Sequence, residues 1–87
     1  MKSIEKAART QIQGLGVRIE ADVLAVVAVN LAGRLDAGPS ERDAVGLAHE
    51  LRMILVELRR QAGDEGTSDV ERVLDRIAAP ELGHSAN

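Results

Sequence analysis

The segment from Arg18 to Leu35 constrains the fold most, because apolar side chains would occupy nearly every face of a helix formed there. Leucines, valines and an isoleucine make two stripes, and four alanines at spacings of four, three and four residues make a third. A helix that is apolar on every side is a buried one. Valines also suit a strand, here over residues 23–29, but the length of the segment and its alanines favour a helix.

A second long helix is predicted over residues 41–62, where apolar residues recur at alternating spacings of three and four. That spacing is typical of the seam of an antiparallel helix pair. Between the two segments, Gly38 can adopt the left-handed conformation that ends a helix, and Pro39 cannot prolong one. Ser40, with Asp43 three residues later, resembles a capping box at the start of a helix. We therefore expect a helical hairpin.

Short helices are predicted on both sides of the hairpin. One covers residues 3–13 with Ser3 as its cap, and the other covers 68–78, where Ser68 and Glu71 form a capping box. No segment is convincing as a strand. The predicted fold class is therefore all-α: an antiparallel hairpin of two long helices flanked by a short N-terminal and a short C-terminal helix.

Charge divides the chain, whose net charge is −3, into three parts. Residues 1–16 form a basic segment, 17–63 the hairpin, and 64–87 an acidic linker, a short helix and a tail that we expect to be disordered. We predict that four cations of the N-terminal side contact DNA phosphates: Lys2, Lys6, Arg9 and Arg18. Arg52, Arg59 and Arg60 of the second long helix are an alternative, although nearby glutamates favour a solvated, partly ion-paired face there.

The absence of Phe, Tyr and Trp leaves only short aliphatic side chains for the core. An aromatic residue would bury about 150–250 Å², and a small core without any is marginal unless copies of the chain bury surface between them. One neighbour within the chain cannot cover every face of the first long helix, so we expect a homo-oligomer built on the hairpin. The predicted interface residues are Ala21, Val23, Leu24, Ala25, Val27, Ala28, Leu31, Ala32, Leu47, Leu51, Ile54 and Leu58.

The C-terminal helix carries an apolar stripe in an acidic part of the chain. Its residues, which we expect to contact a protein partner, are Val70, Val73, Leu74 and Ile77. The absence of aromatic residues argues against a base-stacking platform for single strands or RNA, so the expected nucleic acid is duplex DNA.

Catalytic and metal-binding motifs are incomplete. Without cysteine there is no disulfide, thiolate zinc site or cysteine nucleophile. His49-Glu50 begins like a zinc-protease motif, but Met53 stands where the second histidine belongs. We expect no enzyme activity, no metal and no cofactor. The uncharged run over 23–33 is about half of the roughly 20 residues that span a membrane, and no signal peptide is recognisable, so we expect a cytoplasmic protein. We also expect no small-molecule substrate.

A family resemblance rests on two stretches of the hairpin. Residues 31–38 read L-A-G-R-L-D-A-G, and after Ala44 residues 50–58 read E-L-R-M-I-L-V-E-L. An L-A-x-x-L-D-x-G helix end followed by an E-L-R-x-x-L-x-x-L helix resembles the short small-terminase subunits of tailed phages of actinobacteria, over residues 19–62, about half of the chain. The resemblance implies a non-enzymatic DNA-packaging protein of the bacteriophage host's cytoplasm. Such a protein forms a ring, engages double-stranded viral DNA and regulates the large terminase subunit.

The resemblance also implies separate roles along the chain. In many such subunits a helical hairpin forms the ring and a C-terminal segment contacts the large subunit. In many of them a separate helical part on the N-terminal side binds DNA. Here the single short helix before Gly16 cannot supply a helix-turn-helix, so no base-reading residue is assigned. The alternative function is a small phage or bacterial regulator, antitoxin-like, whose helices bind and inhibit a partner protein. Salt-sensitive binding to duplex DNA would favour the first function, and capture of a single host protein without DNA binding would favour the second.

Overall fold

The computed structural model of the chain describes residues 3–64, 66 and 68–78. Within these ranges the protein is all-helical, with no strand, and the predicted fold class is confirmed to that extent. Lys2 and the predicted tail after residue 80 lie outside the described residues. The elements are α1 (Ser3–Gly14), the 3₁₀ turn η1 (Ile19–Ala21), α2 (Val23–Asp36), α3 (Glu41–Gln61) and α4 (Asp69–Ala78).

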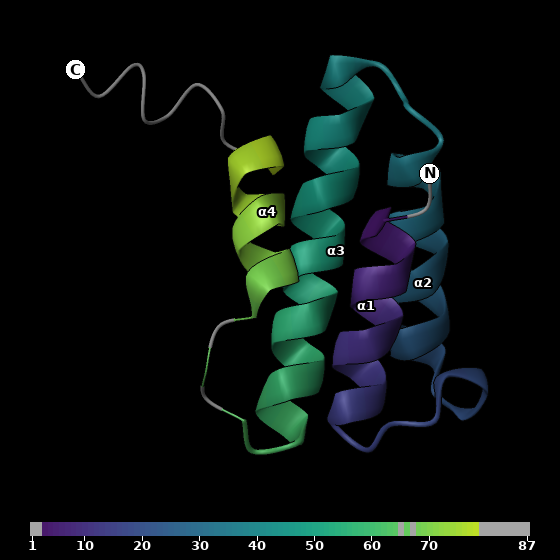
Figure 1. The fold of residues 1–87 in the computed structure, drawn as a ribbon, viewed down its shortest axis with the longest axis vertical. Coiled ribbons are helices and arrows are strands. Elements are labelled where there is room, and N and C mark those ends of the chain that lie inside the picture. Colours follow the sequence, from purple (N-terminus) through teal and green to yellow (C-terminus); the bar gives the residue numbers. More distant parts are fainter. Residues whose placement is uncertain (1–2, 65, 67, 79–87) are drawn as a thin grey trace.

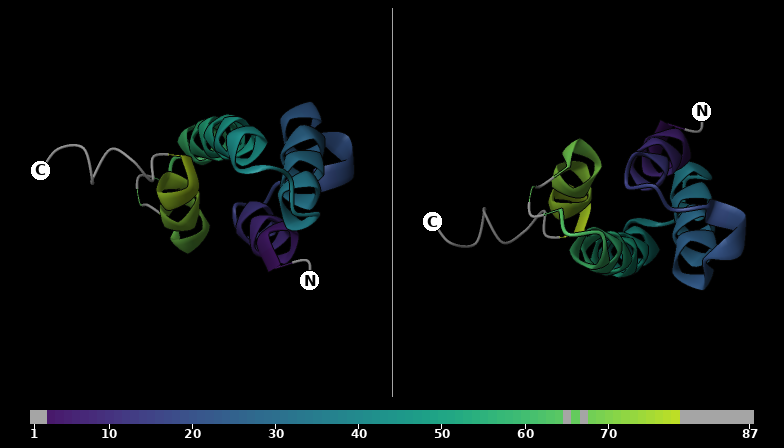
Figure 2. Two further views of the ribbon diagram at one scale, coloured as in Figure 1. Left: turned by 90° about the horizontal axis from the view of Figure 1, so that it is seen from above. Right: turned by 90° about the horizontal axis from the view of Figure 1, so that it is seen from below.

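Successive helices lie side by side and alternate in direction (Figure 1). The central helix is α3, which packs against α2 on one side and α4 on the other. The short helix α1 packs mainly on α2 and makes lighter contacts with α3 and α4. The end-on views show α2 and α4 on opposite sides of the molecule, with α1 and α3 between them (Figure 2).

One core joins all four helices. Its largest fully buried apolar side chains are Ile12 from α1, three leucines from α3 and Leu74 from α4. The helix α2 contributes three alanines and two leucines to the core, and small side chains let neighbouring helices approach closely. The three charge-defined segments of the sequence therefore share a single core. Its buried members are Ala8, Ile12, Ala25, Ala28, Leu31, Ala32, Leu35, Ala48, Leu51, Leu55, Leu58, Val70 and Leu74.

The helix α2 is shorter than predicted, because it begins at Val23 rather than at residue 18. Asp22 has an extended backbone, and its carboxylate accepts a hydrogen bond of 3.1 Å from the amide of Ala25. Asp is among the best residues for this capping position. The apolar periodicity continues before Asp22, which is why it predicts a longer helix, but those residues form η1 instead.

A carboxylate from α2 caps the distant helix α1. Asp36 accepts hydrogen bonds from the amides of Ile4 at 3.0 Å and Glu5 at 2.8 Å. The sequence predicts Ser3 as this cap, whereas the structure makes Ser3 the first residue of the helix and gives the capping role to Asp36. The negative charge lies at the positive end of the α1 dipole, so the contact stabilises the helix and fixes its position against α2.

The predicted turn between α2 and α3 is present, with the serine half of the predicted capping box. Gly38 has a φ of +78°, which a side chain would oppose. The hydroxyl of Ser40 accepts a hydrogen bond of 3.2 Å from the amide of Asp43. These local signals position the end of α2 beside the start of α3, and the side chains there form the site described next.

Candidate functional site

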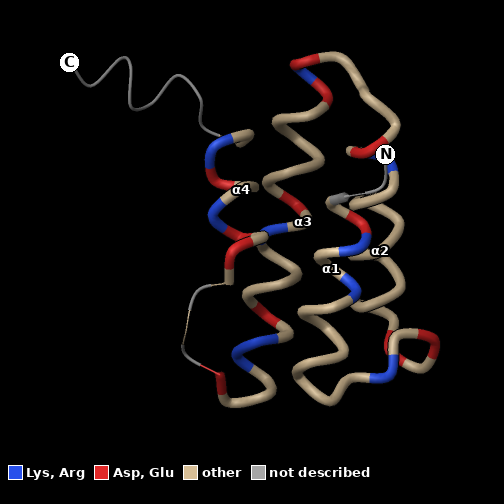
Figure 3. Tube along the Cα trace, viewed as in Figure 1, with Lys and Arg blue, Asp and Glu red and all other residues tan. Residues whose placement is uncertain are grey.

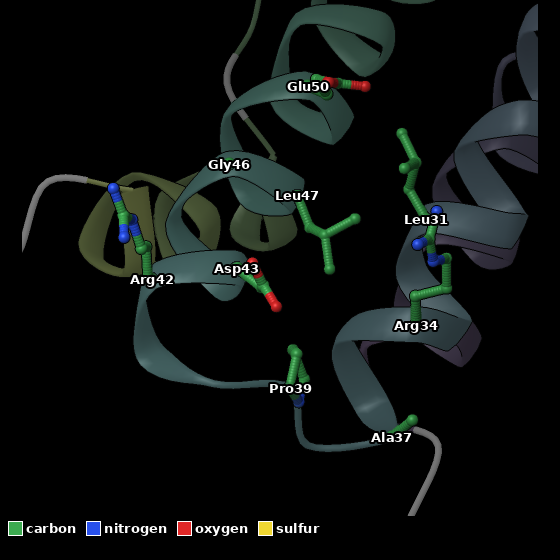
Figure 4. A pocket seen from close by; sticks show the side chains of 9 residues that line it. All are labelled: Leu31, Arg34, Ala37, Pro39, Arg42, Asp43, Gly46, Leu47 and Glu50. Carbon is green, nitrogen blue, oxygen red and sulfur yellow. The ribbon is translucent and has the colours of Figure 1, made fainter.

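A cleft opens between α2 and α3 near the turn that joins them, and its volume is about 620 Å³ (Figure 4). Leu31 of α2 and Leu47 of α3 form its apolar walls, and the side chain of Leu47 points into the space (Figure 4). Charged residues of both signs stand on the two sides, with Arg34 on α2 and Glu50 on α3. The cleft can therefore receive an apolar group while offering a cation and a carboxylate at its rim.

The charges of the cleft are not neutralised within the chain. Among the residues that the structure describes, neither Arg34 nor Glu50 forms an ion pair, although both line the same cleft. The carboxylate of Asp43 on the α3 side is likewise without a cationic partner among them. The α3 side also carries the cation Arg42, so it holds charges of both signs, whereas Arg34 is the charged residue of the α2 side.

Valines extend this surface along α2. Val23 is 79% exposed, Val26 40% and Val27 38%, which is high for apolar side chains of a helix. Val23, Val27 and Arg34 recur at spacings of four and seven, so they lie on one side of α2. On α3, Leu47, Glu50 and Ile54 are spaced by three and four residues, so they also share one side of their helix. We call this surface the outer α2–α3 face and define it by Val23, Val27, Arg34, Gly46, Leu47, Glu50 and Ile54.

The predicted interface residues divide into two groups. Six are buried in the chain's own core: Ala25, Ala28, Leu31, Ala32, Leu51 and Leu58. Six are exposed or half-buried: Ala21, Val23, Leu24, Val27, Leu47 and Ile54. The premise that α2 has one neighbour in the chain is wrong, because α1 and α3 both pack against it. Of the alanine stripe, Ala25, Ala28 and Ala32 lie inside the folded chain, and the second group, with Ala21, remains accessible to another copy.

The predicted DNA-binding cations do not form one cluster. Lys6 is exposed on α1, and Arg9 one turn later forms an ion pair of 3.2 Å with Glu5. Figure 3 shows basic positions, in blue, along α1 and again on the segment that leads from α1 to α2. Arg18 lies beyond the other end of α1, with its side chain 82% exposed and 4.0 Å from the carboxylate of Glu20. Lys2 lies outside the described residues. The described cations are therefore accessible to phosphates but spread along the molecule.

The predicted partner-binding stripe of α4 is split between core and surface. Val70 and Leu74 are buried against the rest of the chain, whereas Val73 is exposed and Ile77 is half-buried. The helix needs the first two side chains for its own docking. Only Val73 and Ile77 are accessible to a partner.

A buried polar network, which the sequence analysis did not identify, connects α1, α3 and α4. Glu71 is 1% exposed and accepts two hydrogen bonds from the guanidinium of Arg59, at 2.7 and 2.8 Å. Gln11 of α1 donates to the same carboxylate at 3.0 Å and accepts from the hydroxyl of Ser68 at 2.6 Å. Ser68 also accepts from the amide of Glu71, which confirms half of the predicted capping box. The other half is absent, because the Glu71 side chain turns into the core instead.

The network keeps a carboxylate charged in the interior. Burial raises the pKa of Glu71, but the hydrogen bonds from Arg59 and then Gln11, with the positive charge of Arg59, outweigh it and lower the pKa below its ordinary 4.5. In return, the hydrogen bond to Glu71 raises the pKa of Arg59. A buried, fully hydrogen-bonded ion pair fixes the position of α4 on α3 and α1 more than it adds to stability.

The remaining arginines of α3 that the sequence offers for phosphate contact are also paired. Arg52 forms an ion pair with Asp75 of α4, and Arg60 pairs with Glu57 at 2.6 Å. The hydrogen bond from Arg60, and next the one from Gln61, hold the pKa of Glu57 below its usual range. The ion-paired alternative for this helix is therefore confirmed.

Two further features are absent from the described part of the chain. No cluster of three or more His, Cys, Asp and Glu side chains is arranged to hold a metal ion there. None of the described helices combines the length and the apolar character that crossing a membrane requires. Comparison with protein-family models, curated proteins and solved structures gives no match to this chain.

Proposed function

We propose that the chain is a phage terminase small subunit: a non-enzymatic DNA-packaging protein that assembles into a homo-oligomeric ring, engages duplex DNA and regulates a large terminase subunit. The observation that carries the proposal is the resemblance of the end of α2 and of α3 to the small-terminase pattern. The pattern's residues have clear structural uses here, since Asp36 caps α1 and Gly38 makes the turn. The pattern therefore coincides with the helix pair on which the fold is built.

Assembly is supported by the exposed apolar residues of the outer α2–α3 face. A monomer gains nothing from exposing Val23 and Val27, and exposed apolar patches commonly mark interaction surfaces. The antiparallel α2–α3 hairpin would form the ring, with the outer α2–α3 face meeting the neighbouring subunit.

DNA engagement is supported by the exposed cations Lys6 and Arg18, with Arg9 held beside Glu5. Each cation would neutralise a phosphate without reading sequence. One copy offers few contacts, but several copies in one assembly act together through effective concentration. For the large subunit, the accessible side chains of α4 are Val73 and Ile77, on a helix whose first turn is acidic.

A gel-shift assay with duplex DNA of mixed sequence tests the proposal. We expect binding that weakens steeply between about 50 and 200 mM salt, because released counterions drive phosphate contact. The double variant Lys6→Glu/Arg18→Glu should lose the shift. Each of Lys6→Glu and Arg18→Glu alone should weaken binding, and Arg76→Glu is the matched control for these single reversals, since Arg76 is exposed on α4 and forms no ion pair among the described residues. No binding at any salt, with capture of one host protein, would instead support the antitoxin-like regulator.

A further inference from the structure

We infer that the groove between α1 and α4 binds an amphipathic helix of a partner protein, and that the flanks of this helix are acidic. The inference goes beyond the proposed function, which offers two side chains of α4 to a partner but assigns no groove, no contribution from α1 and no charge to the partner. Three observations support it: the space between the two helices, the apolar strip along α4 and the free cations at the rim.

The first observation is a cavity of about 500 Å³ between α1 and α4. The two helices are joined beside it by Gln11, which accepts from the hydroxyl of Ser68 and donates to the carboxylate of Glu71. Because α1 packs mainly on α2 and α4 mainly on α3, the two do not close on one another, and both lie on the same side of α3 (Figure 2). The groove is lined on α1 by Lys6, Ala7 and Thr10 and on α4 by Asp69 and Val70.

The second observation is the apolar strip that continues the groove along α4. Val73 and Ile77 lie three and seven residues after Val70, so they share its side of the helix. Val73 is 41% exposed and Ile77 is half-buried. On the facing helix, Ala7 is exposed and small, which lets another backbone approach closely. The strip from Val70 to Ile77 is about 10 Å long, two turns of a helix, and a groove between two helices suits the apolar stripe of a third.

The third observation is the charge of the rim, which is positive although the net charge of the chain is −3. Lys6 on α1 and Arg76 on α4, three residues after Val73, are exposed, and neither forms an ion pair among the described residues. The carboxylate of Asp69 is 3.2 Å from the guanidinium of Arg72. Carboxylates on both flanks of the incoming helix would therefore complement the rim, and a basic helix would be repelled. Duplex DNA could use the cations but would leave the apolar strip uncovered.

Two synthetic peptides labelled with fluorescein test the inference by fluorescence anisotropy. Each has about 16 residues, with leucines at alternating spacings of three and four and alanines on the outer face. One carries glutamate on both flanks of the leucine stripe, and the other carries lysine there. We expect the glutamate peptide to bind with a micromolar dissociation constant and the lysine peptide to bind at least about tenfold more weakly. In nuclear magnetic resonance spectra, the glutamate peptide should shift the amide signals of Ala7, Thr10, Val70 and Val73.

Surface variants with matched controls locate the site. Val73→Asp should weaken binding of the glutamate peptide at least about tenfold, because a carboxylate would be buried under the leucines. Val26→Asp is its control, since Val26 is 40% exposed but lies on α2. Lys6→Glu and Arg76→Glu should each weaken binding about fivefold, whereas Arg18→Glu, away from the groove, should have no effect. Helical circular dichroism should be unchanged in all of these variants, because each alters an exposed side chain.

The inference is overturned if the glutamate peptide does not bind at up to about 1 mM, if the lysine peptide binds as well, or if Val73→Asp and Val26→Asp behave alike. It is also overturned if raising the concentration of the chain alone shifts the same amide signals, because a second copy would then cover the groove. The proposed function is judged separately by the gel shift, to which Arg18 contributes and Arg76 does not. The peptide assay expects the reverse for these two residues, so either can fail without the other.

Discussion

Removing the guanidinium of Arg59 should weaken the docking of α4 severely, because the buried carboxylate of Glu71 then loses its cation. The two groups share hydrogen bonds of 2.7 and 2.8 Å, and Glu71 is 1% exposed. Breaking a buried pair from one side costs about 3–5 kcal/mol. Because Gln11 still donates to the carboxylate and the Arg59 side chain is 12% exposed, we expect about 3 kcal/mol for Arg59→Met.

That loss is large for this chain, since 87 residues at about 0.05–0.15 kcal/mol per residue give a total stability of roughly 4–13 kcal/mol. Urea unfolding followed by far-ultraviolet circular dichroism measures it, because the chain has no aromatic fluorescence. The matched control is Arg60→Met, whose exposed ion pair with Glu57 should leave the midpoint unchanged.

The double variant Arg59→Met/Glu71→Leu completes the test. It replaces the pair by apolar side chains, and we expect it to recover most of the loss because no buried charge remains. The reasoning is refuted if Arg59→Met loses less than about 1 kcal/mol, or if the double variant is no more stable than the single one.

Lowering the pH should change the contribution of Glu71 to stability in opposite directions in the unaltered chain and in Arg59→Met. In the unaltered chain the pKa of Glu71 is lowered, so its contribution is present above the ordinary carboxyl range and is lost as pH falls through the lowered pKa. In Arg59→Met, burial acts without the cation and raises the pKa of Glu71 instead. The deficit of the variant should therefore shrink as pH is lowered from neutral towards the ordinary carboxyl pKa, and an unchanged deficit would contradict this.

Three further predictions concern single positions. Asp36→Ala should destabilise the chain by about 1–2 kcal/mol in urea unfolding, because two amides of α1 lose their cap, whereas Asp36→Asn, which keeps one acceptor oxygen, should cost less; equal losses would mean that a single uncharged acceptor does not sustain the cap. Gly46→Ala should stabilise the chain by about 0.5–1 kcal/mol in urea unfolding; destabilisation would mean that the glycine has a reason within the fold. Lys6→Glu should lower DNA affinity and reduce the slope of log affinity against log salt by about one, and an unchanged slope would exclude Lys6 from the DNA contact.

Features set by neighbours in the sequence were predictable. Gly38, Ser40 and Ser68 each act within three or four residues, and the turn or cap they predict is present. Asp22 is an equally local signal, but the apolar periodicity continues across it and suggests a longer helix. All four helices were therefore identified, with the main error at the start of α2.

Features set by distant contacts were not predictable. Asp36 reads as the polar end of α2, yet its partners are amides 31 and 32 residues away. Glu71 reads as half of a capping box, yet its side chain meets Arg59 and Gln11. The alanines of α2 suggest close helix contact correctly, but only the position of α1 decides that this contact lies within the chain.

The buried network of Gln11, Arg59 and Glu71 has a consequence for how this sequence can evolve. Each of the three side chains serves a different helix, and changing one leaves a polar partner unsatisfied inside the core. Substitution of one of these residues alone should therefore be rare. Homologues should either keep all three residues or replace both members of the ion pair with apolar residues. Such covariation, joining residues up to 60 positions apart, would mark in an alignment the same junction of three helices that the structure shows.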